Sequence, residues 1–386
     1  LIWYRSIRKK YSSYVESTKW LDLLFLSRII GTICYFVFAF YFSNGNVDAF
    51  VYETWASRFA EYFSSFDFRP IYDPRFYRTG EFFYTNFINY PTALFLMITN
   101  GDELTVYYIY SMISFSGILY FIKALAIHEQ IRVSASTLKL FVIIPAFWFW
   151  NSTIGKDAFQ FLGFGIFVYG LVYRQKGLKK IFIILLGIFI NYTVRPPFAL
   201  LLIMCWAGSN FINFKDKGLI KFLKIGVGIA IAFVAIYFIQ QRLQVENLST
   251  ESLNESAQQY QRGTNYGGGR IGGNSLSPGG VVMSYINVLM RPFPWEFRSF
   301  SYLLAGIEIY IVLFLLLKAS RKVNFKQPVN KFFIYWILIL GLVLGLSENN
   351  IGTLARHRSL VILAVVGLYH LSKINKWKKL HNIQPI

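Results

Sequence analysis

Cysteine and histidine are scarce in this chain of 386 residues, which has two of the former and four of the latter. Cys34 and Cys205 both lie within apolar runs, so the sequence supports neither a disulfide framework nor a cysteine metal site. The histidines are scattered, with no pair at the spacing of metal ligands. The sequence therefore requires no metal ion and indicates no other cofactor.

Acidic residues are also few, 19 against 39 basic residues, and the formal net charge is +20. The basic residues are not spread evenly. Six segments between apolar runs hold 25 of them, 20 being Lys, together with four acidic residues. Lysine concentrated in short loops beside apolar runs is typical of the cytoplasmic face of a membrane protein. The charge thus reports topology, and we expect no nucleic-acid partner. The Lys-rich segments are 1–22, 123–139, 174–180, 213–224, 318–331 and 373–386.

Apolar runs recur along the chain, in which 55% of the residues are hydrophobic. We predict an all-α polytopic membrane protein with about ten transmembrane helices and with both termini in the cytoplasm. The first run follows a basic stretch but is long enough to span, so we expect a span and not a cleaved signal. Several other runs are shorter than a full span. The expected spans are 22–43, 105–126, 137–150, 156–173, 180–193, 197–213, 219–240, 301–318, 330–347 and 356–372.

The opposite, outer face is predicted to carry 13 basic residues, 12 of them Arg, and 14 acidic residues. Arg28 lies within the first span and Glu308 within a later one. Arginine stays charged when partly buried, and its planar group of donors matches phosphate oxygens. Arginines retained where basic residues are normally sparse are therefore candidates for binding a diphosphate, although some are expected to pair with the outer carboxylates.

Two outer segments are long, and we treat the whole chain, 1–386, as a single integral membrane domain around them. In segment 43–104, Phe50, Trp55, Phe59 and Phe63 recur at helical spacing, which predicts an amphipathic helix anchored at the membrane surface. The stretch "NFINYPTALFLMITNGD" is a candidate re-entrant piece. Segment 241–299 contains "RGTNYGGGRIGGNSLSPGG", and of a flexible connector and a mobile lid we favour the lid.

Four compact outer motifs place charges at membrane boundaries. For any one of them, a side chain reaching for the interface or a structural ion pair is at least as good an explanation as a site. Because they come from four separate parts of the chain, we expect them to converge on one outer cavity. They are "NSTIGKDAF" with Lys156 and Asp157, "NYTVRPPF" with Arg195, "RPFPWEFR" with Arg291, Glu296 and Arg298, and "SENNIGTLARHR" with Glu348, Arg356 and Arg358.

Glu308 lies about two turns inside an otherwise apolar span, where an ionisable group is a functional candidate. Two interpretations carry equal weight. It fastens helices together, either protonated or paired with an outer arginine, or it serves the proton coupling of a transporter.

The motifs "FWFWNSTIGKDAF", "TVRPPF", "RPFPWE" and "NNIGTLARHRS", with "NVDAFVYE" after the first span, resemble a family of bacterial membrane proteins associated with exopolysaccharide and O-antigen gene clusters. Its members are similar in layout to Wzy-type polysaccharide polymerases and, more distantly, to GT-C glycosyltransferases that use polyprenyl phosphates. The resemblance implies a multi-pass protein of the bacterial inner membrane that acts on its periplasmic side. It also implies an oligosaccharide on undecaprenyl diphosphate as substrate, and a chain-length regulator or other polysaccharide-assembly proteins as partners besides membrane lipids.

Under this hypothesis arginines bind the donor diphosphate and stabilise the charge that develops on it. By analogy of residue type, these are Arg195, Arg291, Arg356 and Arg358, with Lys156 helping to hold the phosphate. A carboxylate accepts the proton of the acceptor hydroxyl. We rank Asp48 first for this role, because the GT-C class has an acidic residue in the first outer loop, with Glu53 and Asp157 next.

Other functions remain open at this stage. A transporter or flippase for a lipid-linked or anionic solute would explain Glu308 and the outer arginines, but the sequence shows no convincing inverted repeat. A GT-C enzyme that transfers single sugars lacks here the large periplasmic domain of many members. A non-catalytic membrane subunit would leave the outer charges without a shared cavity.

Overall fold

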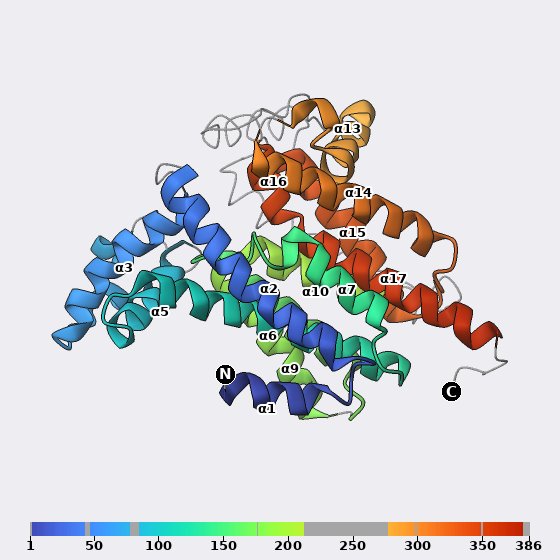
Figure 1. The fold of residues 1–386 in the computed structure, drawn as a ribbon, viewed down its shortest axis with the longest axis horizontal. Helices are drawn as coiled ribbons and strands as arrows, with labels where there is room; N and C mark the ends of the chain where they lie inside the picture. The colour runs from blue at the N-terminus through green and yellow to red at the C-terminus, as the bar shows by residue number, and fades with distance from the viewer. Residues whose placement is uncertain are drawn as a thin grey trace. The chain divides into compact units, whose positions relative to one another are not determined.

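The computed structural model shows a helical protein, as Figure 1 illustrates. Among the described residues, the β-type pairing consists of one isolated bridge between Val15 and Val133. The helical fold predicted from the apolar runs is therefore confirmed. The chain divides into two compact units, Leu1–Ala199 and Leu200–Ile386, and each is described by itself. The structure describes residues 2–42, 47–77, 85–175, 177–211, 277–297, 299–348 and 350–380.

The first unit consists of helices joined by short turns. Proline marks several helix starts, because its fixed φ suits the first turn and its missing N–H costs nothing there. The elements are α1 (Ile2–Tyr11), α2 (Thr18–Val37) with the π-helical turn η1 (Phe38–Phe42), α3 (Asp48–Ser64), α4 (Arg69–Tyr72), η2 (Pro74–Phe76), α5 (Thr85–Ile98), α6 (Glu103–Glu129), α7 (Ala135–Ile143), η3 (Pro145–Phe147), α8 (Lys156–Val172), α9 (Leu178–Val194) and α10 (Pro196–Phe211), which continues into the second unit.

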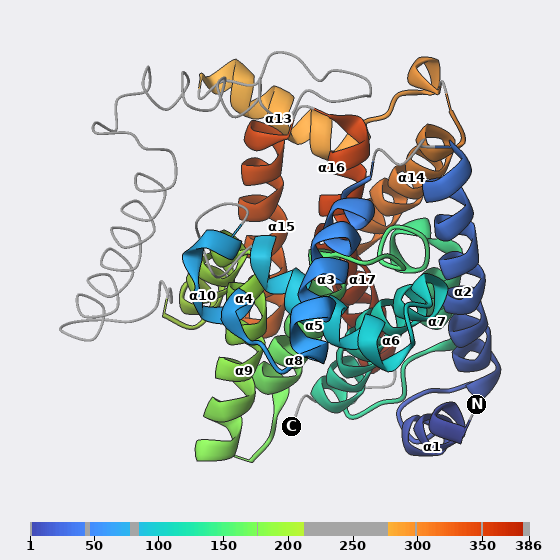
Figure 2. The same cartoon turned by 90° about the vertical axis from the view of Figure 1, so that its left-hand side faces the viewer.

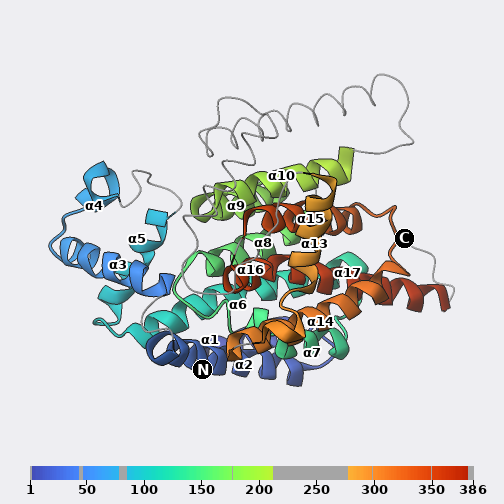
Figure 3. The same ribbon diagram turned by 90° about the horizontal axis from the view of Figure 1, so that it is seen from above.

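Helices α6, α8 and α9 pack in succession at the centre of the first unit, and Figure 3 shows α8 beside both neighbours. Glycine allows the close approach of α6 and α8. A Cβ at Gly117 would overlap the backbone of Phe161, and one at Gly165 would overlap Gly117 itself. Small residues at such crossings let helix backbones touch. Because α8 and α9 form an antiparallel pair, the beginning of α8 lies next to the end of α9.

Helix α3 confirms the predicted helix in segment 43–104, but its aromatic face is placed differently from the expectation. Phe59 and Phe63 are buried within the protein, and the Phe59 ring stacks on Tyr90 of α5 with centroids 5.6 Å apart. Figure 2 shows α3 and α5 side by side. The prediction that these two rings anchor the helix in the membrane surface is therefore wrong, because α5 covers them. The "NFINYPTALFLMITNGD" stretch forms α5 and the turn after it.

The second unit is also built from helices. Its α13 packs on α15, while α14 and α15 both pack on α17. The Asn350 side chain caps α16 by accepting a hydrogen bond from the Gly352 N–H at 2.8 Å. The elements are α13 (Pro278–Met290), η4 (Pro294–Glu296), α14 (Phe300–Ser320), α15 (Pro328–Ser347), α16 (Ile351–His357) and α17 (Ser359–Leu380).

Four helices in the described part of the chain are long and apolar enough to cross a membrane, and a bent pair raises the number to five if it counts as one span. This supports a helical membrane protein, while the count of ten spans and the side of each terminus stay predictions. The spans are Thr18–Phe42, Glu103–Glu129, Phe300–Ser320, Pro328–Ser347 and the pair Ile351–His357 with Ser359–Ile374, bent by 44°.

The expected span at 137–150 is not one helix. Helix α7 ends at Ile143, and Ile144 is extended with φ −78° and ψ 117° because it precedes Pro145. The short helix η3 follows at once. The expected span 219–240 and all of segment 241–276 in the proposed lid lie outside the described residues.

Candidate functional site

Arg195 is held between α8 and α9 in the first unit. Its N–H closes α9 on the Asn191 carbonyl oxygen at 2.8 Å, and its position before Pro196 makes the backbone leave the helix there. The side chain turns back onto the first turn of α8. Its Nη2 lies 3.1 Å from Asp157 Oδ1, and its Nη1 donates to Gln160 Oε1 at 2.7 Å. Asp157 and Gln160, three residues apart, share one face of α8.

Lys156 begins α8 beside this group and is buried, as are Asp157 and Arg195. The positive end of the helix dipole favours the Asp157 carboxylate in the first turn. Two cations and one carboxylate leave this group with a formal charge of +1. The structure therefore brings together three of the predicted residues, Lys156, Asp157 and Arg195, and adds Gln160, which the sequence analysis did not single out.

Glu53, one of the three base candidates, is a buried carboxyl group of α3. It faces Glu103 at the start of α6, and both line a cavity of about 400 Å³ between α3, the end of α5 and α6. Burial raises the pKa of Glu53 to about 8, with further contributions from a hydrogen bond to Glu103 and from the Glu103 charge. Its Oε2 is buried and has no hydrogen-bond partner among the described residues. A buried carboxyl group beside a second carboxyl group is an arrangement that shares a proton.

Asp48 lies in the first turn of α3 and is exposed. Glu53 lies five positions further along the helix, so the two carboxylates project from different sides of it. The structure does not place Asp48 in the cavity that Glu53 lines. A base role is therefore better supported by burial at Glu53 than at Asp48.

Arg291 ends α13 in the second unit, before Pro292. Its Nη2 lies 3.2 Å from Glu296 Oε1, and Glu296 Oε2 accepts the Phe293 N–H at 2.8 Å. The other two side-chain nitrogens, Nε and Nη1, are buried and have no hydrogen-bond partner among the described residues. Buried N–H groups are nearly always satisfied in proteins, so two open donors on one guanidinium call for a ligand.

Arg358 is 1% exposed and holds the backbone of Arg291 in place. It donates through Nη1 to the Arg291 carbonyl oxygen and through Nη2 to the Ala305 carbonyl oxygen at 2.7 Å. Its Nε lies 3.5 Å from Glu308 Oε1. Of the two interpretations of Glu308, the structure supports the pairing with an arginine that fastens helices together. The ion pair fastens α14 to the junction of α16 and α17.

The remaining predicted residues lie nearby in sequence but outside these bonds. Glu348 Oε1 accepts a hydrogen bond from His357 Nδ1 at 2.7 Å, which links the end of α15 to α16. Arg356 lies in the last turn of α16 and is half-buried. Arg298 lies outside the described residues. One cluster in the first unit thus holds Lys156, Asp157 and Arg195, and one in the second holds Arg291, Glu296, Glu308 and Arg358. A single cavity shared by all the predicted residues stays a prediction.

Arg28, in α2, is a buried cation to which the sequence analysis gave no role. It donates to the backbone oxygens of Ser111 at 3.0 Å and Asn151 at 2.8 Å, and also to Phe147 O and Ser114 Oγ. These bonds tie α2 to α6 and to the turn that precedes α8. The signal that would have found it is its charge inside an apolar span. Four carbonyl and hydroxyl acceptors explain it as a structural residue.

Comparison with protein-family models, with curated proteins and with solved structures finds no match to this chain. Within the described ranges, no group of three or more His, Cys, Asp or Glu side chains has the arrangement of a metal site. Function must therefore be argued from the two arginine clusters and the carboxyl pair.

Proposed function

We propose that this chain is a glycosyltransferase of the bacterial inner membrane, similar to the Wzy-type polymerases. It transfers a saccharide from a polyprenyl diphosphate to an acceptor sugar on the outer side. The observation that carries the proposal is Arg291, with one nitrogen fixed by Glu296 and two buried nitrogens open to a ligand. A diphosphate offers several strong acceptor oxygens and negative charge, and it is therefore the ligand class that best satisfies such a group.

The surroundings of Arg291 suit a diphosphate on which negative charge develops during the reaction. Arg358 fixes the backbone of Arg291 through its carbonyl oxygen, and the Phe293 ring lies 5.8 Å from the Arg291 guanidinium carbon. The Phe293 ring also stacks on Trp295 at 4.8 Å, and Trp295 is 76% exposed. Donors held in place before the reaction stabilise a leaving diphosphate more than mobile ones do. The exposed indole is a candidate surface for stacking on a sugar ring.

The reaction has a simple balance. The acceptor hydroxyl oxygen bonds to the anomeric carbon, the bond from that carbon to the diphosphate oxygen breaks, and the polyprenyl diphosphate leaves with the electron pair. The hydroxyl proton goes to a carboxylate. Among the three carboxylates that the sequence offers for this role, all of them in the first unit, we favour Glu53. Asp157 is bound to Arg195, whereas the raised pKa of Glu53 makes its ionised form a stronger base than an ordinary carboxylate.

The Glu308–Arg358 pair bears on the transporter alternative. That hypothesis used Glu308 as a proton carrier, but the structure gives the residue an arginine partner inside the second unit. A helix-fastening ion pair explains Glu308 without proton movement. Transfer chemistry is for this reason the function that we favour.

The test is polymer extension by the purified protein in proteoliposomes. The vesicles contain a polyprenyl-diphosphate-linked oligosaccharide and no nucleotide sugar, and the products are separated by size. We expect a ladder of extended saccharides and release of polyprenyl diphosphate. If the oligosaccharide crosses the bilayer unchanged, the chain is a transporter. If it neither crosses nor grows longer with donors of several repeat structures, the transferase proposal is wrong.

The role of Glu53 is tested through the pH dependence of the same reaction. We expect the rate to rise with an apparent pKa of about 8, since the base must be ionised. Glu103→Gln removes the like charge that raises this pKa and supplies an amide that can donate a hydrogen bond to the Glu53 carboxylate, so the rise should move to lower pH. Glu53→Gln should abolish the rise. An unchanged profile in both variants would assign the base elsewhere.

A further inference from the structure

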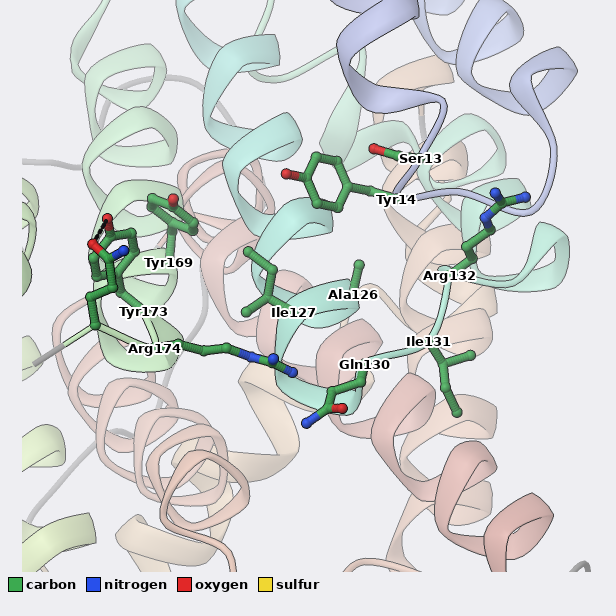
Figure 4. A pocket seen from close by; sticks show the side chains of 11 residues that line it. Ser13, Tyr14, Ala126, Ile127, Gln130, Ile131, Arg132, Tyr169, Tyr173 and Arg174 are labelled. Carbon is green, nitrogen blue, oxygen red and sulfur yellow. Dashed lines mark hydrogen bonds between the residues drawn. The ribbon is translucent and has the colours of Figure 1, made fainter. Parts of the chain in front are cut away.

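A second cavity, of about 580 Å³, lies in the first unit at the far end of α8 from Lys156 and Asp157. Its walls come from the turn after α1, the end of α6 with the residues that follow, and the end of α8 (Figure 4). Helix α8 has 17 residues, so its two ends are about 25 Å apart. The cavity is therefore separate from the Arg195 cluster. Its volume lies within the usual range for a small-molecule site.

The lining carries two cationic residues among aromatic and aliphatic side chains. It includes Arg132 and Arg174 and contains no Asp or Glu. Figure 4 shows the Arg174 side chain reaching across the cavity toward Gln130, with Arg132 on the side away from Tyr169 and Tyr173. Neither arginine side chain makes a hydrogen bond or ion pair with the part of the chain that the structure describes. Two exposed cationic residues thus line one hollow whose walls contain no acidic residue.

Lys123 adds a third positive charge behind the aromatic wall. Its Nζ lies 4.4 Å from the ring centroid of Tyr169 and 5.6 Å from that of Tyr14, and both rings line the cavity. Two acidic residues lie nearby along the chain, Glu16 and Glu129, and neither lines the cavity. Glu16 accepts the Ala135 N–H at 2.9 Å, and Glu129 is buried 3.5 Å from His128. The local field therefore favours an anion.

We propose that this cavity binds a phosphate-bearing anion through Arg132 and Arg174. Guanidinium groups recognise phosphate oxygens through charge and directed hydrogen bonds. The phosphate has two sources, the headgroup of an anionic lipid and a free phosphate compound. Two wall segments lie in the Lys-rich regions 1–22 and 123–139, and the third runs from the end of α8 into the Lys-rich region 174–180. The sequence predicts these regions on the cytoplasmic face, where basic pockets beside membrane helices bind anionic headgroups. This site does not depend on the proposed transfer reaction.

Binding to the full-length protein in neutral detergent tests the proposal with three probes. They are short-chain phosphatidylglycerol, phosphatidylcholine of the same chain length, and inorganic pyrophosphate. We expect phosphatidylglycerol or pyrophosphate to bind the protein and phosphatidylcholine to bind at least about tenfold more weakly. Binding of phosphatidylglycerol alone identifies a lipid headgroup as the source, and binding of pyrophosphate identifies a free phosphate compound. If neither anion binds more tightly than phosphatidylcholine, the proposal is wrong.

Variants locate the binding. The double variant Arg132→Ala/Arg174→Ala should weaken anion binding at least about tenfold, because each basic group near such a site contributes substantially. Arg132→Lys/Arg174→Lys retains the charge and should recover part of the affinity. The matched control Arg5→Ala/Lys9→Ala removes two exposed charges of the same unit outside the cavity, and its affinity should change less than twofold. Equal weakening by the control and the cavity variant would overturn the assignment.

Discussion

The two arginine clusters differ in what their guanidinium groups bind. In the first unit, Asp157 and Gln160 hold Arg195 through two separate nitrogens. In the second unit, Glu296 holds one nitrogen of Arg291, while two others are buried and have no hydrogen-bond partner among the described residues. The same residue type at a helix end before proline therefore serves as a fixed structural and electrostatic element in one place and as an open donor in the other.

Among the variants proposed here, Arg358→Ala should cause the largest loss of stability. Arg358→Ala leaves Glu308 as a buried charge without its arginine, and we expect a loss of about 3–5 kcal/mol in the free energy of unfolding. Unfolding of purified protein in detergent measures it. The double variant Glu308→Leu/Arg358→Met removes both charges and should recover most of the loss. A double variant as unstable as Arg358→Ala would show that the ion pair is not the cause.

Arg195 should show a smaller loss of the same kind. We expect Arg195→Ala to lower the free energy of unfolding by about 2–4 kcal/mol, because it removes the buried partner of Asp157. The expected loss is smaller than at Arg358 because the Arg195 side chain is 9% exposed, whereas that of Arg358 is 1% exposed. The same unfolding assay measures it. Arg291→Ala should cost less than about 1 kcal/mol, since the variant also removes two unsatisfied donors. Equal losses of unfolding free energy for Arg195→Ala and Arg291→Ala would contradict the view that Arg195 is fully bonded within the protein and Arg291 is not.

Glu53 predicts a pH dependence of stability that is independent of any reaction. Its pKa in the folded protein, about 8, lies above its value in the unfolded chain. The folded state therefore holds the proton more tightly, and this contribution is present at pH 4 and lost as the pH rises through 8. The unfolding midpoint should fall over that interval, and Glu53→Gln should fall less. A midpoint with the same pH profile in both proteins would contradict the raised pKa.

Arg75 is the matched control for all arginine variants and has the smallest expected effect. It is exposed and pairs with Asp73 of its own turn at 2.6 Å. Exposed pairs of this kind contribute little. We expect Arg75→Ala to leave both the unfolding midpoint and polymer extension unchanged within error. A marked loss of activity would mean that outer arginines act through general charge, and not through the two clusters.

Much of the fold follows from the sequence because apolar runs and helix boundaries are local features. Proline marks the starts of α13 and α15, and the apolar patterns of α2, α6, α14 and α15 identify these helices directly. The aromatic face of α3 shows where this approach fails. Helical spacing predicted which side of α3 is apolar, but whether lipid or α5 covers Phe59 depends on a packing partner more than twenty residues away.

In the candidate site too, the sequence identified charged residues but not the contacts that depend on how helices pack. The sequence singled out Asp157 and Arg195 as charges at membrane boundaries, but their ion pair depends on the packing of α8 against α9 through glycine. Glu103 was counted only as one of the outer acidic residues, because its significance arises from the proximity of Glu53 in space. Gln160 was missed for the same reason, since an uncharged side chain in a helix gives no signal of its own.

The rate of polymer extension by Arg291→Ala, compared with that of Arg75→Ala in the same proteoliposomes, tests the central claim most directly. Loss of a donor to the developing charge predicts a rate at least about 100-fold lower, with the protein still folded. Equal rates for the two variants would contradict the assignment of Arg291 to the donor diphosphate.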